Sequence, residues 1–168
     1  DPYDPLRIEE AHALLPPTLQ HLVQRGEATP ILIASGAIFP EGRIQTVRLK
    51  GIAPEQHLLN LPSQFLANAA QDGIPAMIGS RMAKQTKLAV GDTVTVRWRD
   101  IHGTFDATDL QIVQIMTTSV QSVDSGQVWL PLRALREMLH ASDTEATIVI
   151  VEQRLASAPA GDAVWQFH

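Results

Sequence analysis

Serine is the first side chain to weigh for chemistry, because the 168-residue chain contains no cysteine. A serine hydrolase places its nucleophile in a G-x-S-x-G elbow between a strand and a helix. Ser35 lies in I-A-S-G-A and Ser80 in I-G-S-R-M, so neither has both flanking glycines. Ser80 is better explained as a helix cap. A phosphate-binding loop is also absent from the pattern, since no G-K-[ST] follows any glycine. We expect no catalytic site in this chain.

Histidine and aspartate residues form one short cluster in the sequence, at His102, Asp106 and Asp109. A metal ion needs ligands that converge, and on a strand only alternate residues share a face. His102 and Asp106 can share a face, whereas Asp109 then points away unless a β-bulge intervenes. The pattern therefore favours a polar hairpin end with solvent-facing carboxylates. His12 and His21 are separated by a double proline, so we expect no common ligand face there either.

The three tryptophans are candidates for ligand stacking. Trp98 lies on an alternating strand with valines, which predicts core packing. Trp129 precedes a helix start, where we expect it to fill the junction between strand and helix. Trp165 and Phe167 follow an Ala/Pro/Ser-rich stretch and suit the approach to a membrane, where aromatic residues gather at the interface.

Composition sets the limits within which these side chains act. Hydrophobic residues make up 45% of the chain and charged residues 18%, enough to bury a core. The net charge of −5 argues against a nucleic-acid partner. The lack of cysteine excludes disulfides and thiolate metal sites. No apolar run is long enough to span a bilayer. The chain starts at Asp1 without methionine, so we expect a processed protein or a piece of a longer one.

The elements that must position these residues follow from periodicity and turn chemistry. At the amino-terminal end we expect a short helix that starts at Pro5 and includes Leu14 and Leu15, then a second helix that ends near Arg25. Farther along we expect a strand at 31–38 paired as a hairpin with one at 46–52, followed by a helix at 62–70 and a short helix at 81–86. Strands at 94–98 and 104–115 come next. The chain then forms a strand at 128–130, a helix through Leu139, and a central strand at 146–151 that is buried on both faces.

Five segments follow one another along the chain, each occurring once. They are VRLKGIAPE at 47–55, IGSRMA at 78–83, LAVGDTVTV at 88–96, IVQI at 112–115 with Asp124 behind it, and VWLPL at 128–132. We also expect a tight turn at Gly91–Asp92, with the Asp92 carboxylate bonded to local backbone amides.

Together these segments resemble the extracytoplasmic domain of ABC-transporter permeases of the FtsX-like, MacB and lipoprotein-releasing type. The resemblance covers about 31–151 and departs from the family at Gln114 and Ala53. It implies an α+β (mixed α/β) fold, the MacB-like periplasmic core domain. A porter-like βαβ part is expected at 1–51 and 123–155, a smaller β-rich inserted subdomain at 52–122, and a linker toward a membrane helix at 156–168. The residues that carry the motifs have structural roles: Gly51, Pro54, Glu55, Gly79, Gly91, Asp92, Asp124 and Pro131.

The resemblance also implies a function without catalysis. Such a domain lies on the periplasmic side of the inner membrane and binds no cofactor, since ATP binds a separate cytoplasmic ATPase subunit. Its partners are a second permease copy or paralogue, that ATPase and, in some systems, a periplasmic carrier or adaptor. ATP hydrolysis drives release of a lipoprotein, lipid, peptide or drug, or transmits force. Two alternatives stay open: a free-standing small-molecule-binding or adaptor domain, and a hydrolase that uses Asp and His.

Overall fold

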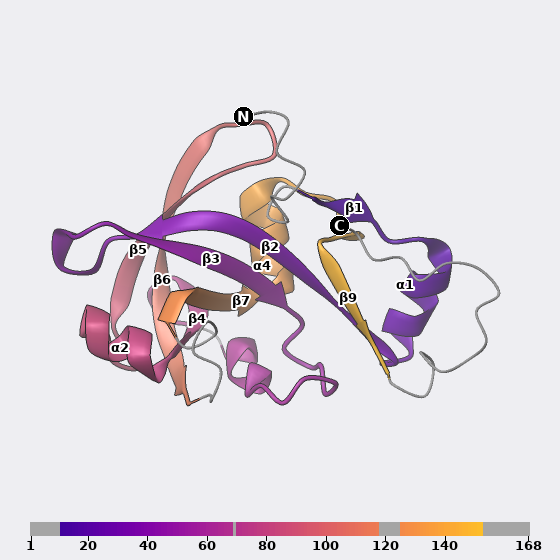
Figure 1. Ribbon diagram of the computed structural model, residues 1–168, viewed down its shortest axis with the longest axis horizontal. Coiled ribbons are helices and arrows are strands. Elements are labelled where there is room, and N and C mark those ends of the chain that lie inside the picture. Colours follow the sequence, from indigo (N-terminus) through magenta and orange to yellow (C-terminus); the bar gives the residue numbers. More distant parts are fainter. Residues whose placement is uncertain (1–10, 69, 118–124, 153–168) are drawn as a thin grey trace.

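The computed structural model describes residues 11–68, 70–117 and 125–152 (Figure 1). These residues form a mixed α+β domain, as the sequence predicts. Its strands are β1 (Ala13–Leu14), β2 (Ala28–Ile38), β3 (Gln45–Ile52), β4 (Ile74–Gly79), β5 (Thr93–Arg99), β6 (Phe105–Met116), β7 (Gln127–Pro131), β8 (Glu145–Ala146) and β9 (Ile148–Val151). Its α-helices are α1 (Pro17–Gln24), α2 (Ser80–Thr86) and α4 (Leu132–Leu139), and two 3₁₀ turns are η2 (Pro40–Gly42) and η3 (Ser63–Ala67).

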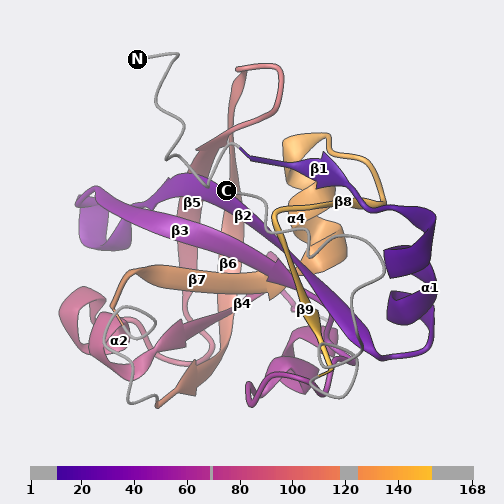
Figure 2. The same ribbon diagram turned by 45° about the vertical axis from the view of Figure 1, so that its right-hand side comes forward.

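Six of the strands close into a barrel. They pair in the order β3-β7-β4-β6-β5-β2, and β2 then pairs with β3 as well, which completes the ring. The pairs β3–β7 and β4–β6 are parallel and the others antiparallel. β2 is long enough to leave the barrel, where its first residues pair with β9. Figure 2 shows β3, β7 and β4 on the near side and β5 and β6 behind them. Closure gives every strand an inner and an outer face.

The barrel interior is the main hydrophobic core. Alternate residues of β5 (Val94, Val96 and Trp98) point inward and the residues between them are exposed. Two helices from different parts of the chain pack against this core, α2 through Met82 and Ala83 and α4 through four apolar side chains: Leu132, Leu135, Met138 and Leu139. A second, smaller cluster lies on the outer face, where η3 and its flanking loop cover β3, β4, β6 and β7.

Most elements with strong local patterns form as expected. The second helix is α1, the hairpin of β2 and β3 pairs over seven residues, and the alternating strand and its long partner are β5 and β6. Trp98 is buried in the core, and its indole Nε1 donates a hydrogen bond of 2.7 Å to the Met138 carbonyl. Trp129 is buried too, but on the outer face among Ile52, Leu66 and Met77. Trp165 and Phe167 lie outside the described residues.

Three expectations about elements are wrong. Ala13 and Leu14, near the end of the first expected helix, form strand β1, which pairs with β8, because the two prolines after Leu15 stop a helix and the extended backbone finds a distant partner. Residues 5–10 of that expected helix lie outside the described residues. The 62–70 helix shortens to the single 3₁₀ turn η3. The 146–151 segment splits into β8 and β9 around Thr147, whose hydroxyl accepts a bond from the Ile33 amide. β9 is an edge strand and Ile148 is partly exposed.

Candidate functional site

Gly51 and Pro131 lie together where α4 packs on the barrel. β3 and β7 run parallel with Gly51 beside Leu130 and Ile52 beside Pro131, which is also the residue before α4. A Cβ at Gly51 would sit 3.1 Å from the Leu132 Cα and 3.1 Å from the Leu135 Cβ. Only a residue without a side chain therefore allows this close approach of helix and strand.

Gly79, Gly91 and Asp92 lie around α2. Gly79 is the residue before the helix, one position earlier than the Ser80 cap that we expected. Gly91 has φ of +96°, and its amide donates to the Ile112 carbonyl at 2.7 Å. The Ala89 amide donates to the Asp92 Oδ2 at 2.8 Å, so the predicted turn and its carboxylate–amide bond are confirmed. These three residues set the path from β4 through α2 into β5.

The remaining motif residues do not converge with these. The Pro54 carbonyl accepts a hydrogen bond from the Ser63 hydroxyl at 3.1 Å, which holds the loop before η3, and Glu55 is exposed in the same loop. Asp124 lies outside the described residues. The described motif residues thus stand in turns and at close packing contacts, and their family role stays a prediction.

The His/Asp cluster is divided between the two faces of β6. Asp106 is paired with Trp98 and Asp109 with Thr95, whose hydroxyl donates to the Asp109 Oδ1 at 2.8 Å. Asp109 therefore points away from Asp106, as strand alternation predicts. His102 lies in the turn before β6. Across the described ranges, no group of three or more His, Cys, Asp or Glu side chains is placed to hold a metal ion.

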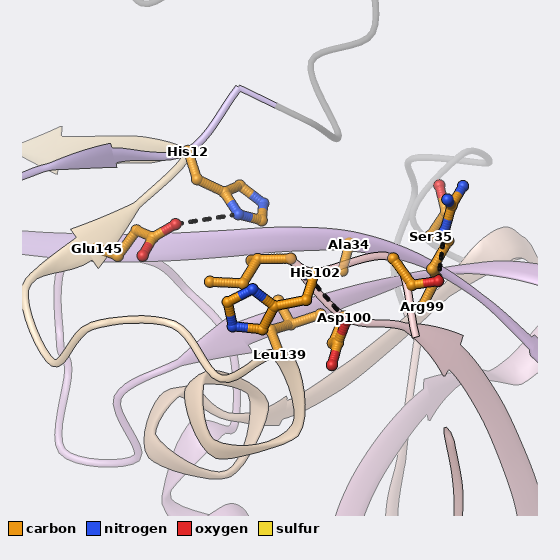
Figure 3. A pocket seen from close by; sticks show the side chains of 10 residues that line it. His12, Ala34, Ser35, Arg99, Asp100, His102, Leu139 and Glu145 are labelled. Atoms are coloured by element: carbon orange, nitrogen blue, oxygen red, sulfur yellow. Dashed lines mark hydrogen bonds and ion pairs between the residues drawn. The ribbon is translucent and has the colours of Figure 1, made fainter. Parts of the chain in front are cut away.

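A polar cavity of 690 Å³ lies beside β2, between the β5–β6 turn and the segment after α4 (Figure 3). Its wall combines residues far apart in the sequence: His12, Ala34, Ser35, Arg99, Asp100, Ile101, His102, Gly103, Leu139 and Glu145. The cavity forms along one edge of β2, where β5 pairs only with residues 36–38 of β2 and β9 pairs only with residues 28–31. Ala34 and Ser35, in the stretch of β2 between these pairings, line the cavity.

Asp100 holds the β5–β6 turn on one side of this cavity. Its Oδ1 accepts hydrogen bonds from the amides of Thr104 at 2.8 Å and His102 at 2.9 Å, and its Oδ2 lies 3.0 Å from the His140 Nδ1. The Thr104 amide bond contributes most to lowering the pKa of this carboxyl, and the His140 and His102 bonds add to it while partial burial opposes them. Asp100 thus stays ionised and fixes the turn to the end of α4.

His12 and Glu145 hold the opposite side. The His12 Nδ1 lies 3.3 Å from the Glu145 Oε1 and its Nε2 lies 2.8 Å from the Ile33 carbonyl oxygen. The other Glu145 oxygen accepts from the Ser142 amide at 3.1 Å. Sequence reasoning weighed His12 only against His21 and missed this pair. No local signal could have found it, because β1 and β8 meet only through the fold.

Comparisons with known proteins identify a solved structure with a similar fold, but they do not identify a family. No protein-family model matches the sequence, and no curated protein sequence matches it. Among solved structures, the chain is similar to the extracellular domain of the noncanonic ABC-type transporter YknZ from Gram-positive bacteria. The similarity has a TM-score of 0.53 and 11% sequence identity, and it covers 84% of this chain and 73% of that one. The two chains therefore share a fold. In the described part of this chain, no helix has the length and apolar character that crossing a membrane requires.

Proposed function

We propose that this chain is the extracytoplasmic domain of an ABC-transporter permease of the FtsX-like or MacB type. The observation that carries the proposal is the fold shared with the YknZ extracellular domain over most of both chains. The five ordered sequence segments support it independently, because they rest on residue types alone, while the structural similarity covers 84% of this chain.

In this proposal the domain performs no chemistry of its own. A cytoplasmic ATPase subunit hydrolyses ATP, and the permease's membrane helices carry the movement to the periplasmic side. The barrel suits that task because its strands are paired on both sides and its interior is packed against α2 and α4, so that it moves as one body. The work done is release of a lipoprotein, lipid, peptide or drug, or transmission of force to a second permease copy or a periplasmic carrier.

The proposed architecture has a porter-like part at 1–51 and 123–155 and an inserted part at 52–122. Within the described residues, β4 of the inserted part pairs with β7 of the other part, and β5 of the inserted part pairs with β2. The two parts would therefore be subdivisions of one barrel and its surroundings, because no break in the sheet separates them. The linker at 156–168, which lies outside the described residues, would lead to a membrane helix.

The alternative is a free-standing extracytoplasmic domain that binds a small molecule or serves as an adaptor. The polar cavity beside β2 favours it, since its 690 Å³ falls in the size range of small-molecule sites.

The complete gene product and its membrane complex separate the two functions. We expect membrane-spanning segments on both sides of this domain, and we expect the affinity-purified full-length protein to bring down an ABC ATPase identifiable by mass spectrometry. A gene product that consists of a cleavable signal peptide and this domain alone would refute the transporter proposal. Purification from membranes without any ATPase would also count against it.

A further inference from the structure

One row of side chains crosses four strands on the outside of the barrel. Ser35 of β2 pairs with Arg48 of β3, which pairs in turn with Gln127 of β7. On the other side of β2, Gly36 pairs with Trp98, so Arg99 continues the row beside Ser35. Neighbouring strands lie about 4.8 Å apart, so the backbones of Arg99 and Arg48 are about 10 Å apart.

Four positive charges share this outer face. Lys50 lies two residues from Arg48 on β3 and is paired with Trp129 of β7. Arg97 lies two residues from Arg99 on β5 and is paired with Ala37 of β2. Side chains two residues apart on a strand point to the same face. We call Arg48, Lys50, Arg97 and Arg99 the cationic face. It stands on a chain whose net charge is −5, so its sign is opposite to that of the whole molecule. A local field of this kind attracts anions.

Three of these cations have no carboxylate partner among the described residues. Lys50 lies 5.1 Å from the centre of the Trp129 ring, and Arg97 lies 5.0 Å from that of Phe105. Arg99 donates through Nε to the neutral Gly103 carbonyl at 3.0 Å. Burial, and secondarily the charge of Arg48, lower the pKa of the half-buried Lys50 ammonium. An added anion would relieve this unfavourable environment.

Two hollows flank the row and share Ser35. One is the polar cavity that Arg99 lines in Figure 3, where His12 and Glu145 already pair with each other and Asp100 is bonded to His102. The second, of 570 Å³, lies over Ser35, Arg48 and Gln127. Gln127 is 8% exposed, and its Oε1 has no hydrogen-bond donor in the part of the chain that the structure describes.

We propose that the cationic face and its two hollows bind an extended acidic peptide segment of another protein, independently of any role in transport. A peptide with acidic side chains at alternate positions places carboxylates about 7 Å apart on one side. With this spacing, successive carboxylates can form ion pairs with cations on different strands. A simple anion such as phosphate supplies negative charge but spans only one or two of the cations.

The test measures binding of a fluorescein-labelled, end-capped peptide of alternating glutamate and serine by fluorescence anisotropy. Arg97→Gln together with Arg99→Gln, both on the exposed part of the face, should weaken binding about tenfold. The matched control is Lys84→Gln with Arg133→Gln, which removes two exposed charges from α2 and α4. It should leave binding within about twofold. Lys50→Gln should weaken binding as well.

Circular dichroism melting establishes that each variant is folded. If Lys50→Gln unfolds the domain, the binding measured for the Arg97→Gln/Arg99→Gln variant still tests the proposal. An equal loss in the Lys84/Arg133 control would show unspecific attraction and overturn the proposal. So would equal binding of a glutamine–serine peptide. Binding of inorganic phosphate or phosphatidylglycerol vesicles that depends on Arg97 and Arg99, in the absence of peptide binding, would assign the face to a different ligand and refute the peptide.

Discussion

Gly51→Ala tests how tightly α4 is set against the barrel. The new methyl group would lie 3.1 Å from the Leu132 Cα, 3.1 Å from the Leu135 Cβ and 3.2 Å from the Leu135 Cδ2. Two of these atoms belong to the body of the helix and cannot rotate away. Because Leu135 is fully buried, the helix must shift as a unit or the strand must bend.

The magnitude follows from two opposing effects. Adding a methyl group to a packed core destabilises a protein by about 1–3 kcal/mol. Replacing glycine by alanine also reduces the entropy of the unfolded chain, which returns about 0.4–1 kcal/mol. The net loss should be about 1–2 kcal/mol, which for a domain of this size lowers Tm by about 3–6 °C.

The assay is urea unfolding together with thermal melting of the wild type, Gly51→Ala and the control Gly126→Ala. Gly126 has nothing within 4 Å of the position of a Cβ, so the control should lose less than about 0.5 kcal/mol. In a Leu135→Ala background the cost of Gly51→Ala should shrink, because the methyl group gains the space of the missing side chain. A Gly51→Ala protein as stable as the wild type would refute the close packing of α4 on β3.

Three further perturbations test the turns and bonds described above. Asp92→Ala should lose about 1 kcal/mol in urea unfolding through the missing bond to the Ala89 amide, while Asp92→Asn keeps an acceptor and should lose less. Trp98→Phe should lose about 1–3 kcal/mol, because the buried Met138 carbonyl loses its indole donor; an unchanged midpoint would contradict that bond. The lowered pKa of Asp100 means that the folded state binds its proton more weakly than the unfolded state. Its stabilisation is thus present above about pH 4 and lost as pH falls through the folded-state pKa, so Asp100→Asn should flatten the acid side of the stability–pH curve.

The elements that the sequence predicts well are those whose signals are local. Alternation at Val94, Val96 and Trp98 places β5, and the spacing of Leu132, Leu135 and Leu139 places α4. Glycine with positive φ at 91 and the adjacent aspartate specify a turn within a few residues. Each of these patterns is decided by interactions inside one element or one turn, so one sequence is enough.

The elements predicted wrongly depend on distant partners. The 146–151 segment has the apolar, β-branched composition of a central strand, yet β9 lies at the edge of the sheet, paired with the part of β2 that extends out of the barrel. Ala13 and Leu14 have helix-compatible types, yet β8 offers them a strand partner. Composition cannot report such pairings, since the partner lies more than a hundred residues away.

The same division applies to the sites. By itself the sequence determined the mixed α+β class, the core face of β5 and α4, and the turn chemistry of Gly91 and Asp92, because side-chain size, period and backbone freedom act locally. Only the tertiary structure decided that His12 meets Glu145 and that Arg99, Ser35, Arg48 and Gln127 stand in one row. Closing the barrel set the row, since closure fixes the register between strands that are far apart in the sequence. The β1–β8 pairing outside the barrel brought His12 to Glu145.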